Sequence, residues 1–381
     1  MSRNKYTIAQ IAGDGIGPEV IGEARKVADA AGEIYGFDIK WVEYPFGASH
    51  YIKTGEILPG KAVKEMEEMD AILLGAIGDP RVKPGILERG ILLTLRFHFD
   101  MYTNLRPAKT FPRVPIPVKI PGDKTLDILV VRENTEDLYM GLGASSEKDI
   151  SYDMSLTRGL YDLSGRLDLK LEPSSPMAVQ LGIASEKGIQ RITARACKEA
   201  ASRGLETFTL ASKSNAMPQL YGFWEEIAAS EAEKHNMKMK TVNVDALCYH
   251  LVRNPWEYDV ILCPNLFGDI VSDLLAGISG GLGVAAGANC GDRIGMYEPI
   301  HGSAPDIAGQ EKANPIAAIL SASLLLSSIG ETSAAKGIEK AVSEYLEFSD
   351  EKHLPLEMGG NASTNETGIK IISMMSKLQN I

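Results

Sequence analysis

The chain has 381 residues, of which 44% are apolar and 23% are charged, an ordinary balance for a globular protein. This length is too great for one small core, so we expect two domains or one large α/β unit. The net charge of −11 disfavours nucleic acid as a partner, because phosphate binding requires a basic surface. The longest apolar stretch, near 316–329, contains serines and is too short to span a bilayer, so no membrane association is expected.

Cysteine usage and the N-terminal residues both bear on the compartment. The cysteines are widely spaced and form no CxxC pair, which predicts neither a zinc site nor a disulfide framework. The first residues run straight into a predicted strand and lack a secretory pattern. We therefore expect a cytoplasmic protein.

Strands and helices alternate through the first part of the chain. A buried strand is predicted at 6–12, then a Gly-rich turn, GDGIGPE, and an amphipathic helix at 18–35. A strand at 38–44, a helix at 60–69 and a buried strand at 70–75 follow. This alternation predicts a parallel α/β sheet. The turn lacks the complete glycine pattern of phosphate-binding loops, so a tight turn requiring positive φ is its plainer interpretation.

The middle of the chain changes character twice. The stretch 107–121 contains five prolines and is interpreted as a crossover between domains. A strand at 127–132 follows, and residues 144–183 then mix polar, Gly-containing and alternating segments, which suits a hairpin arm. The α/β pattern resumes with a helix at 183–202, a strand at 206–210, a helix at 223–233, strands at 240–244 and 259–262, and a mostly helical last third.

Asp269 and Asp273 stand four residues apart in NLFGDIVSD, just after the strand at 259–262. In a helix this spacing places both carboxylates on one face, where like charges repel. A divalent cation offsets such repulsion, and Mg²⁺ is commonly held by one or two carboxylates plus substrate oxygens. A solvated acidic patch is the alternative. The carboxyl end of a strand is where open α/β sheets bind ligands, which favours a metal site.

Three arginines form a second set of candidates. Arg96 and Arg106 flank a predicted helix and the segment FHFDMYTNL, and Arg132 ends the strand at 127–132. Arginine binds carboxylates bidentately, so three convergent arginines would suit a dicarboxylate, whereas singly each would form a surface ion pair. Tyr139 follows ENTED and is either a packed aromatic residue or a proton donor.

The remaining candidate functional residues are Lys213, in SKSN, and those of the loop at 298–315. A lysine at the end of a strand faces the cleft, where it can perform acid–base work, although a solvated lysine is the alternative. The loop contains His301, Asp306 and Asn314 and has little helix or strand character, which is typical of functional loops. A carboxylate there can bind the ribose of an adenosine cofactor.

These segments resemble the β-decarboxylating dehydrogenase family, which includes the isopropylmalate, isocitrate, homoisocitrate, tartrate and D-malate dehydrogenases. Seven motifs occur in the family's order over nearly the whole chain: GDGIGPE, LRxxFDMYTNLRP, VRENTEDLY, SKSN, NLFGDIVSD, EPIHGSAPDIAG and GGNAST. The resemblance implies an isocitrate/isopropylmalate dehydrogenase-like α/β fold, distinct from the Rossmann fold. It also implies a split large cofactor-binding domain at 1–105 and 257–381, and a small domain at 106–256 with a dimerisation arm near 144–183.

The resemblance also implies a homodimer, or a higher oligomer, with shared active sites. By resemblance, Tyr139 is the acid that protonates the product carbon, and Lys213, from the partner subunit, is the base. The arginine triplet resembles the clamp on the substrate carboxylates. The metal ligands for Mg²⁺ or Mn²⁺ are Asp269 and Asp273, with Asp245 from the other subunit. The implied contacts to NAD are His301, Gly302, Ser303, Ala304, Asp306, Ile307, Asn314 and Asn215.

Several positions bear on which substrate and which cofactor the enzyme uses. Leu92 and Leu93 lie three and four residues before Arg96, so on a helix they share its face and would leave a third substrate carboxylate unpaired. We therefore expect oxidative decarboxylation of 3-isopropylmalate to 4-methyl-2-oxopentanoate, the leucine-biosynthesis reaction. Asp306-Ile307, in place of the Lys-Tyr pair of NADP-dependent isocitrate relatives, favours NAD.

Other substrates stay open. RENTED and the stretch from Lys213 to Trp224 resemble tartrate and D-malate dehydrogenases, so these are the first alternative, ahead of isocitrate and homoisocitrate. An inactive regulatory paralogue is the non-enzymatic alternative. Asp137 stands where the family usually has Gly, which raises the question of backbone freedom beside Tyr139.

Overall fold

The computed structural model describes residues 3–122 and 124–378. The chain forms two compact units. Unit 1 comprises the described residues up to Leu95, those of Leu105–Asp127, and those from Leu275 onward, and unit 2 comprises Arg96–Asn104 and Ile128–Leu274. Unit 1 therefore contains both the first and the last described residues.

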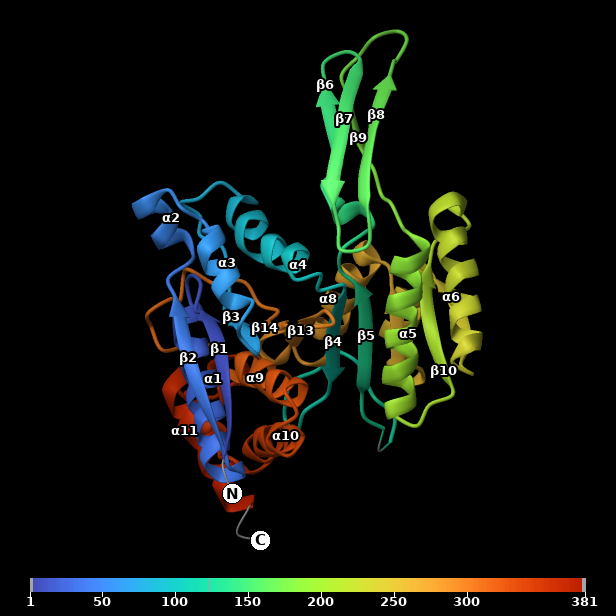
Figure 1. Ribbon diagram of the computed structural model, residues 1–381. Helices are drawn as coiled ribbons and strands as arrows, with labels where there is room; N and C mark the ends of the chain where they lie inside the picture. The colour runs from blue at the N-terminus through green and yellow to red at the C-terminus, as the bar shows by residue number, and fades with distance from the viewer. Residues whose placement is uncertain (1–2, 123, 379–381) are drawn as a thin grey trace. The chain divides into compact units, whose positions relative to one another are not determined.

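Unit 1 contains a mixed sheet in the order β13-β14-β3-β1-β2 (Figure 1). Its strands are β1 (Asn4–Ile11), β2 (Phe37–Tyr44), β3 (Ala71–Leu74), β13 (Ala286–Cys290) and β14 (Gly295–Pro299). Neighbours are parallel except β13 and β14. The helices are α1 (Gly17–Tyr35), α2 (Ala48–Thr54), α3 (Gly60–Met66), α9 (Ile316–Ser328), α10 (Thr332–Phe348) and α11 (Thr364–Leu378). All four residues of β3 are buried, as expected of a strand covered on both faces.

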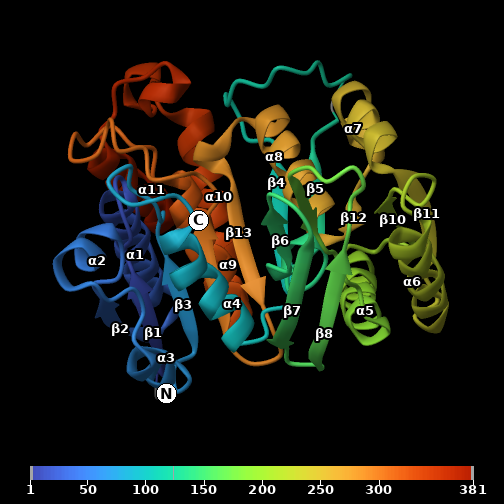
Figure 2. The same cartoon turned by 90° about the horizontal axis from the view of Figure 1, so that it is seen from above.

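Unit 2 contains a parallel sheet in the order β11-β10-β12-β5. Its strands are β5 (Asp127–Glu133), β10 (Thr207–Ser212), β11 (Lys238–Asn243) and β12 (Val260–Cys263). The helices α5 (Glu186–Ser202), α6 (Phe223–Lys234) and α7 (Val244–Arg253) belong to this unit, and α8 (Asn265–Ser279) begins in it. Two further elements, α4 (Thr94–His98) and β4 (Thr103–Lys109), lie where the chain passes between the units (Figure 2).

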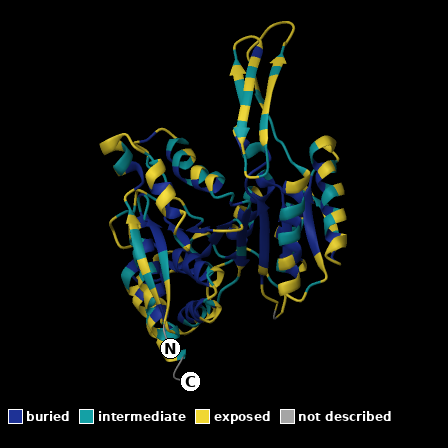
Figure 3. Cartoon of the chain, in the orientation of Figure 1, coloured by how far each residue is buried: buried dark blue, intermediate teal, exposed yellow. Residues whose placement is uncertain are grey.

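The predicted arm at 144–183 is present as two antiparallel strand pairs that extend from the body of unit 2 (Figure 1). One pair joins β6 (Gly143–Ser146) to β9 (Met177–Gln180), and the other joins β7 (Ile150–Thr157) to β8 (Asp162–Leu169). Exposed and half-buried residues alternate along β7 and β8, as Figure 3 shows. The hairpin architecture is thus confirmed, whereas the dimerisation role stays a prediction.

Three expectations from the sequence were wrong in detail. The last third contains the antiparallel pair β13–β14, so the sheet is not wholly parallel; its segments AGANC and GMYEP are short and lack alternation, because both faces are buried. Arg106 lies within strand β4 instead of flanking a helix. The sequence Pro264–Gly268 also suggested a turn before α8, but Gly268 lies inside that helix. In the described part of the chain, no helix has both the length and the apolar character needed to cross a bilayer.

Candidate active site

The start of helix α8 forms one wall of the site. Asp269 and Asp273 both lie within α8, so the predicted one-turn spacing of their carboxylates is present. Gly268 lies directly beneath Arg132, and a Cβ atom on Gly268 would stand 2.4 Å from the Cγ atom of Arg132. Glycine at this position therefore allows the arginine side chain to lie across the first turn of α8.

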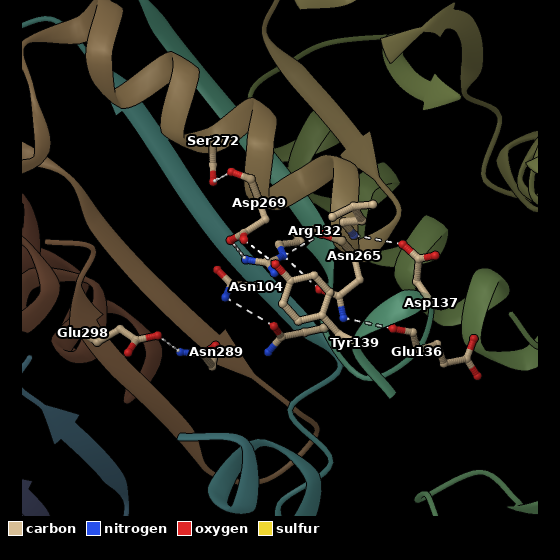
Figure 4. A network of polar contacts seen from close by, with 12 residues as sticks. Asn104, Arg132, Glu136, Asp137, Tyr139, Asn265, Asp269, Ser272, Asn289 and Glu298 are labelled. Atoms are coloured by element: carbon tan, nitrogen blue, oxygen red, sulfur yellow. Dashed lines mark hydrogen bonds and ion pairs between the residues drawn. The ribbon is translucent and has the colours of Figure 1, made fainter. Parts of the chain in front are cut away.

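Arg132, at the end of β5, is buried and connects α8 to Tyr139 (Figure 4). Its Nε atom donates to the backbone oxygen and the Oδ1 atom of Asn265, at 2.9 and 3.1 Å. Its Nη1 atom donates to Asp269 Oδ1 at 2.5 Å. The other oxygen of Asp269 accepts the Tyr139 hydroxyl at 2.5 Å. Asp269, the predicted metal ligand, therefore contacts both the predicted substrate ligand Arg132 and the predicted proton donor Tyr139.

The environment of Tyr139 suits a group that must keep its proton. Burial, followed by the hydrogen bond and charge of Asp269, raises the pKa of Tyr139 above its usual value. The guanidinium carbon of Arg132 lies 5.1 Å from the centre of the tyrosine ring. A phenol is already protonated at neutral pH at its ordinary pKa, so the hydroxyl of Tyr139 carries a proton and donates it to Asp269.

Two buried glutamates fix the backbone that leads from β5 to Tyr139. Glu133 accepts from the backbone N–H of Thr135 at 2.8 Å, the Thr135 hydroxyl at 2.7 Å, and the N–H of Glu136 at 2.8 Å. Burial and the neighbouring Glu136 raise the pKa of Glu133 to about 7. Glu136 accepts from the N–H and hydroxyl of Ser185, the N-cap of α5, at 2.9 and 2.6 Å. Neither glutamate was singled out from the sequence, although polar residues ending a buried strand were a usable signal.

Lys213 and Asp245 form a separate pair. Lys213 follows β10 directly, and its Nζ atom donates to Asp245 Oδ1 at 2.7 Å, which lowers the pKa of Asp245. Among the described residues, no three His, Cys, Asp or Glu side chains are grouped so that they could hold a metal ion. Asp245 is therefore not grouped with Asp269 and Asp273 in the same chain. Asn215 lies beyond Lys213 and is exposed.

The remaining predicted substrate residues are divided between the two units. Arg96 is buried in α4 and belongs to unit 2, and Arg106 is buried in β4 and belongs to unit 1. Leu92 and Leu93 are half-buried in unit 1, at the end of a π-helical turn, η1 (Glu88–Leu93). Arg96 itself lies in the α-helical segment that follows, so the predicted shared face of these leucines and Arg96 begins in a π-helical turn and stays a prediction.

The loop after β14 borders a cavity of about 520 Å³ within unit 1. Five predicted cofactor residues line it: His301, Gly302, Ala304, Ile307 and Asn314. Burial lowers the pKa of His301, so its ring is neutral at neutral pH, and its Nε2 atom is shielded from solvent without a partner in the described part of the chain. His301 therefore lines the cavity as a neutral ring whose Nε2 atom is shielded from solvent.

Three predicted cofactor residues are not in the lining of this cavity: Asn215, described above, and Ser303 and Asp306 of the loop itself. The carbonyl of Ser303 accepts the N–H of Ile16 at 2.8 Å, which fixes the loop to the GDGIGPE turn. Asp306 is exposed, and its carbonyl accepts from Gln310 Nε2 at 2.7 Å. Glu357, which sequence reasoning missed, does line the cavity and accepts from Asn314 Nδ2 at 2.6 Å.

The family model described as "Isocitrate/isopropylmalate dehydrogenase" matches residues 7–371. The chain belongs to this isocitrate/isopropylmalate dehydrogenase family. Its expected fold class and its expected identity as an oxidoreductase of the decarboxylating dehydrogenase type are thereby confirmed.

Curated relatives and solved structures agree with membership of the isocitrate/isopropylmalate dehydrogenase family. A 3-isopropylmalate dehydrogenase from Thermobifida fusca is 38% identical, over 99% of each chain. Another, from Mycolicibacterium vanbaalenii, is 41% identical over 89% of this chain and 93% of its own. An isocitrate dehydrogenase from Methylococcus capsulatus superposes with a TM-score of 0.82 at 30% identity, over 97% of this chain and 99% of its own. A β-decarboxylating dehydrogenase from Thermococcus kodakarensis superposes with a TM-score of 0.75 at 32% identity, over 99% and 98%.

Proposed function

We propose that this chain is an NAD- and divalent-metal-dependent 3-isopropylmalate dehydrogenase that forms 4-methyl-2-oxopentanoate in leucine biosynthesis. The main support is the cluster in which Asp269 accepts from both Arg132 and Tyr139. It occurs in a chain about 40% identical to several 3-isopropylmalate dehydrogenases. We assign the three residues of this Asp269 cluster to separate roles: Arg132 binds a substrate carboxylate, Asp269 binds the metal, and Tyr139 returns the proton.

The carboxylates on α8 fit a divalent cation. Asp269 is partly open to solvent, with 37% of its side chain exposed, and Asp273 follows one turn later. We assign these two ligands to one subunit and Asp245 to the other, with Mg²⁺ or Mn²⁺ as the ion. When bound, such an ion polarises the 2-hydroxyl and the adjacent carboxylate of the substrate.

The protein's own side chains perform the proton transfers. Arg96, Arg106 and Arg132 would hold the substrate carboxylates. Lys213, from the second subunit, would accept the proton of the 2-hydroxyl as the hydride leaves carbon 2. After the β-carboxylate departs as CO₂, Tyr139 would donate a proton to carbon 3. The position of Tyr139 supports the last role, because its hydroxyl lies 2.5 Å from the carboxylate of Asp269, the proposed metal ligand.

The cavity in unit 1 fits a dinucleotide cofactor. A cavity of about 520 Å³ with largely apolar walls and a few polar side chains, among them His301 and Asn314, is typical of cofactor sites. We propose NAD, which accepts the hydride from carbon 2. Asp306 would favour it over NADP by repelling a 2′-phosphate.

We propose a cytoplasmic homodimer with shared active sites. Exposed apolar side chains lie on α7 and α8, with Tyr249 62%, Val252 46% and Ile270 53% exposed. An apolar patch formed by these side chains would suit a protein interface. A second copy bound there would let its Lys213 and Asp245, which pair with each other in the single chain, complete the site.

Steady-state kinetics over a panel of malates tests the function. With NAD and Mg²⁺ or Mn²⁺, kcat/KM for 3-isopropylmalate should exceed that for isocitrate by at least about tenfold, from burial of the isopropyl group. A higher value for D-malate or tartrate would assign the chain to the alternative substrate class. Absence of turnover with every member of the panel would support an inactive paralogue.

A further inference from the structure

Asp137 has a backbone conformation that is unusual for a residue with a side chain. Its φ is 64° and its ψ is −150°, a region that essentially only glycine occupies without strain. The residue is also almost fully buried, at 1% exposure. A side chain retained at a strained, buried position must make contacts that hold it there.

The Asp137 carboxylate contacts two other segments of the site. One oxygen accepts the backbone N–H of Leu266, in the first turn of α8, at 2.9 Å. The other accepts the hydroxyl of Tyr221 at 3.3 Å. Tyr221 is buried in the π-helical turn η3 (Pro218–Gly222) that follows Lys213 along the chain, and its ring lies 4.5 Å from that of Phe267. One carboxylate therefore connects the segment before Tyr139, the start of α8, and the segment after Lys213.

A second contact joins the same two segments beside the first. Asn265 Nδ2 donates to the backbone oxygen of Glu136 at 3.1 Å, so residues 136–137 are fastened to 265–266 at adjacent points (Figure 4). Tyr139 stands two residues beyond Asp137, and its hydroxyl reaches Asp269 on the next part of the same helix at 2.5 Å. The Asp137–Leu266 contact and the Tyr139–Asp269 contact thus close a ring between two short segments.

We propose that Asp137 is a positioning residue, which holds the Tyr139 hydroxyl on Asp269 by fastening the preceding turn to α8. This inference rests on the proposed function, in which Tyr139 returns the proton to carbon 3. A merely structural role for Asp137 would appear in stability alone, because glycine relieves the strain at this φ but leaves the Leu266 N–H and the Tyr221 hydroxyl without this acceptor. A positioning role requires the carboxylate oxygens.

The test combines Asp137→Gly with Tyr139→Phe in a double-mutant cycle. Asp137→Gly should lower kcat for 3-isopropylmalate about tenfold in the folded enzyme, with KM within about twofold, because misplacement of the acid affects a step after binding. In the Tyr139→Phe background the same change should cost less than about twofold. Asp137→Asn should restore kcat to within about threefold, because its amide oxygen can accept from Leu266 and its NH₂ can donate to the Tyr221 oxygen.

Each alternative result has a stated meaning. Wild-type kcat in Asp137→Gly, or an equal loss in both backgrounds, would overturn the positioning role. If Asp137→Gly fails to fold, Tyr221→Phe replaces it in the cycle, since it removes one donor to Asp137 and leaves the backbone unchanged. It should lower kcat about two- to threefold, and this loss should vanish in Tyr139→Phe; persistence of the loss would overturn the inference. Full activity of Tyr139→Phe alone would instead overturn the proposed proton donor, and an inactive wild type the proposed substrate.

Discussion

The Asp269 cluster in unit 2 and the cavity-lining loop in unit 1 are built in different ways. In the cluster, charged and polar side chains bond directly to one another, as Arg132 and Tyr139 do to Asp269. The loop is held mainly through backbone atoms, since the carboxylate of Glu19 accepts the N–H groups of Gly309 and Glu311. Proton transfer and metal binding need atoms at fixed separations, whereas a cofactor cavity needs shape and a few polar anchors.

This difference leads to an expectation about kinetics. Substitutions in the cluster should lower kcat, because they remove groups that act during the reaction. Substitutions around the cavity should raise the KM for NAD and leave kcat nearly unchanged, because they remove interactions made equally before and during the reaction.

The largest effect is expected from the metal ligands. Asp269→Asn and Asp273→Asn should each reduce kcat/KM by about a thousandfold, the effect of losing several kcal/mol of charge stabilisation, while circular dichroism shows a retained fold. Excess EDTA should abolish activity, and Mg²⁺ or Mn²⁺ should restore it. Asp259→Asn, at an exposed carboxylate just before β12, is the matched control and should be near wild type. Full activity in EDTA would refute the metal assignment.

Substitutions of the proposed base, Lys213, and of the proposed acid, Tyr139, should slow different steps of the reaction. Lys213→Met should lower the rate of NADH formation about 10³-fold or more, because no base removes the hydroxyl proton. Tyr139→Phe should lose about 10²-fold by slowing the later protonation, so that the 2-oxo acid intermediate, supplied directly, also turns over poorly. Wild-type rates of Tyr139→Phe on both compounds would contradict the proton-donor role.

Cofactor preference tests the loop through Asp306. The wild type should favour NAD over NADP by at least about tenfold in kcat/KM, because the carboxylate repels a 2′-phosphate. Asp306→Asn should reduce that ratio, chiefly through a lower KM for NADP. An NADP preference in the wild type would show that the exposed carboxylate of Asp306 does not face the ribose.

A smaller effect is expected at the predicted apolar wall. Leu92→Ala should lower kcat/KM for 3-isopropylmalate about three- to tenfold, as expected for partial loss of a half-buried aliphatic contact. D-malate lacks the isopropyl group, so its kcat/KM should change by less than about twofold. Equal losses on both substrates would indicate that Leu92 supports the fold here and does not contact the substituent.

The smallest effect is expected at Glu357. Glu357→Gln should raise the KM for NAD about threefold with kcat unchanged, because a charge-assisted hydrogen bond to Asn314 is weakened. Glu347→Gln, at an exposed glutamate on α10, is the control. A fall in kcat for Glu357→Gln with constant KM for NAD would contradict the expectation that cavity substitutions act on KM and cluster substitutions on kcat.

Local pattern was sufficient for several parts of this protein. The one-turn spacing of Asp269 and Asp273 follows from helical periodicity once α8 is recognised, and the arm is visible as a break in the α/β rhythm. Ordered motifs identified the family, and the matching family model confirmed it. These features depend on residues close together in the sequence or on motif order, and neither requires coordinates.

Long-range packing decided the rest. The bond from Asp269 to Arg132 joins residues 137 positions apart, and Asp137 meets Leu266 across 129. The contact of Glu136 with Ser185 and the approach of Glu357 to Asn314 likewise join residues 49 and 43 positions apart and have no local signature. At Asp137 the sequence raised a question about backbone freedom, and only the fold supplied the answer. Asp137 keeps its positive φ because its buried carboxylate accepts from Tyr221 and Leu266, two residues that are far from it in the sequence.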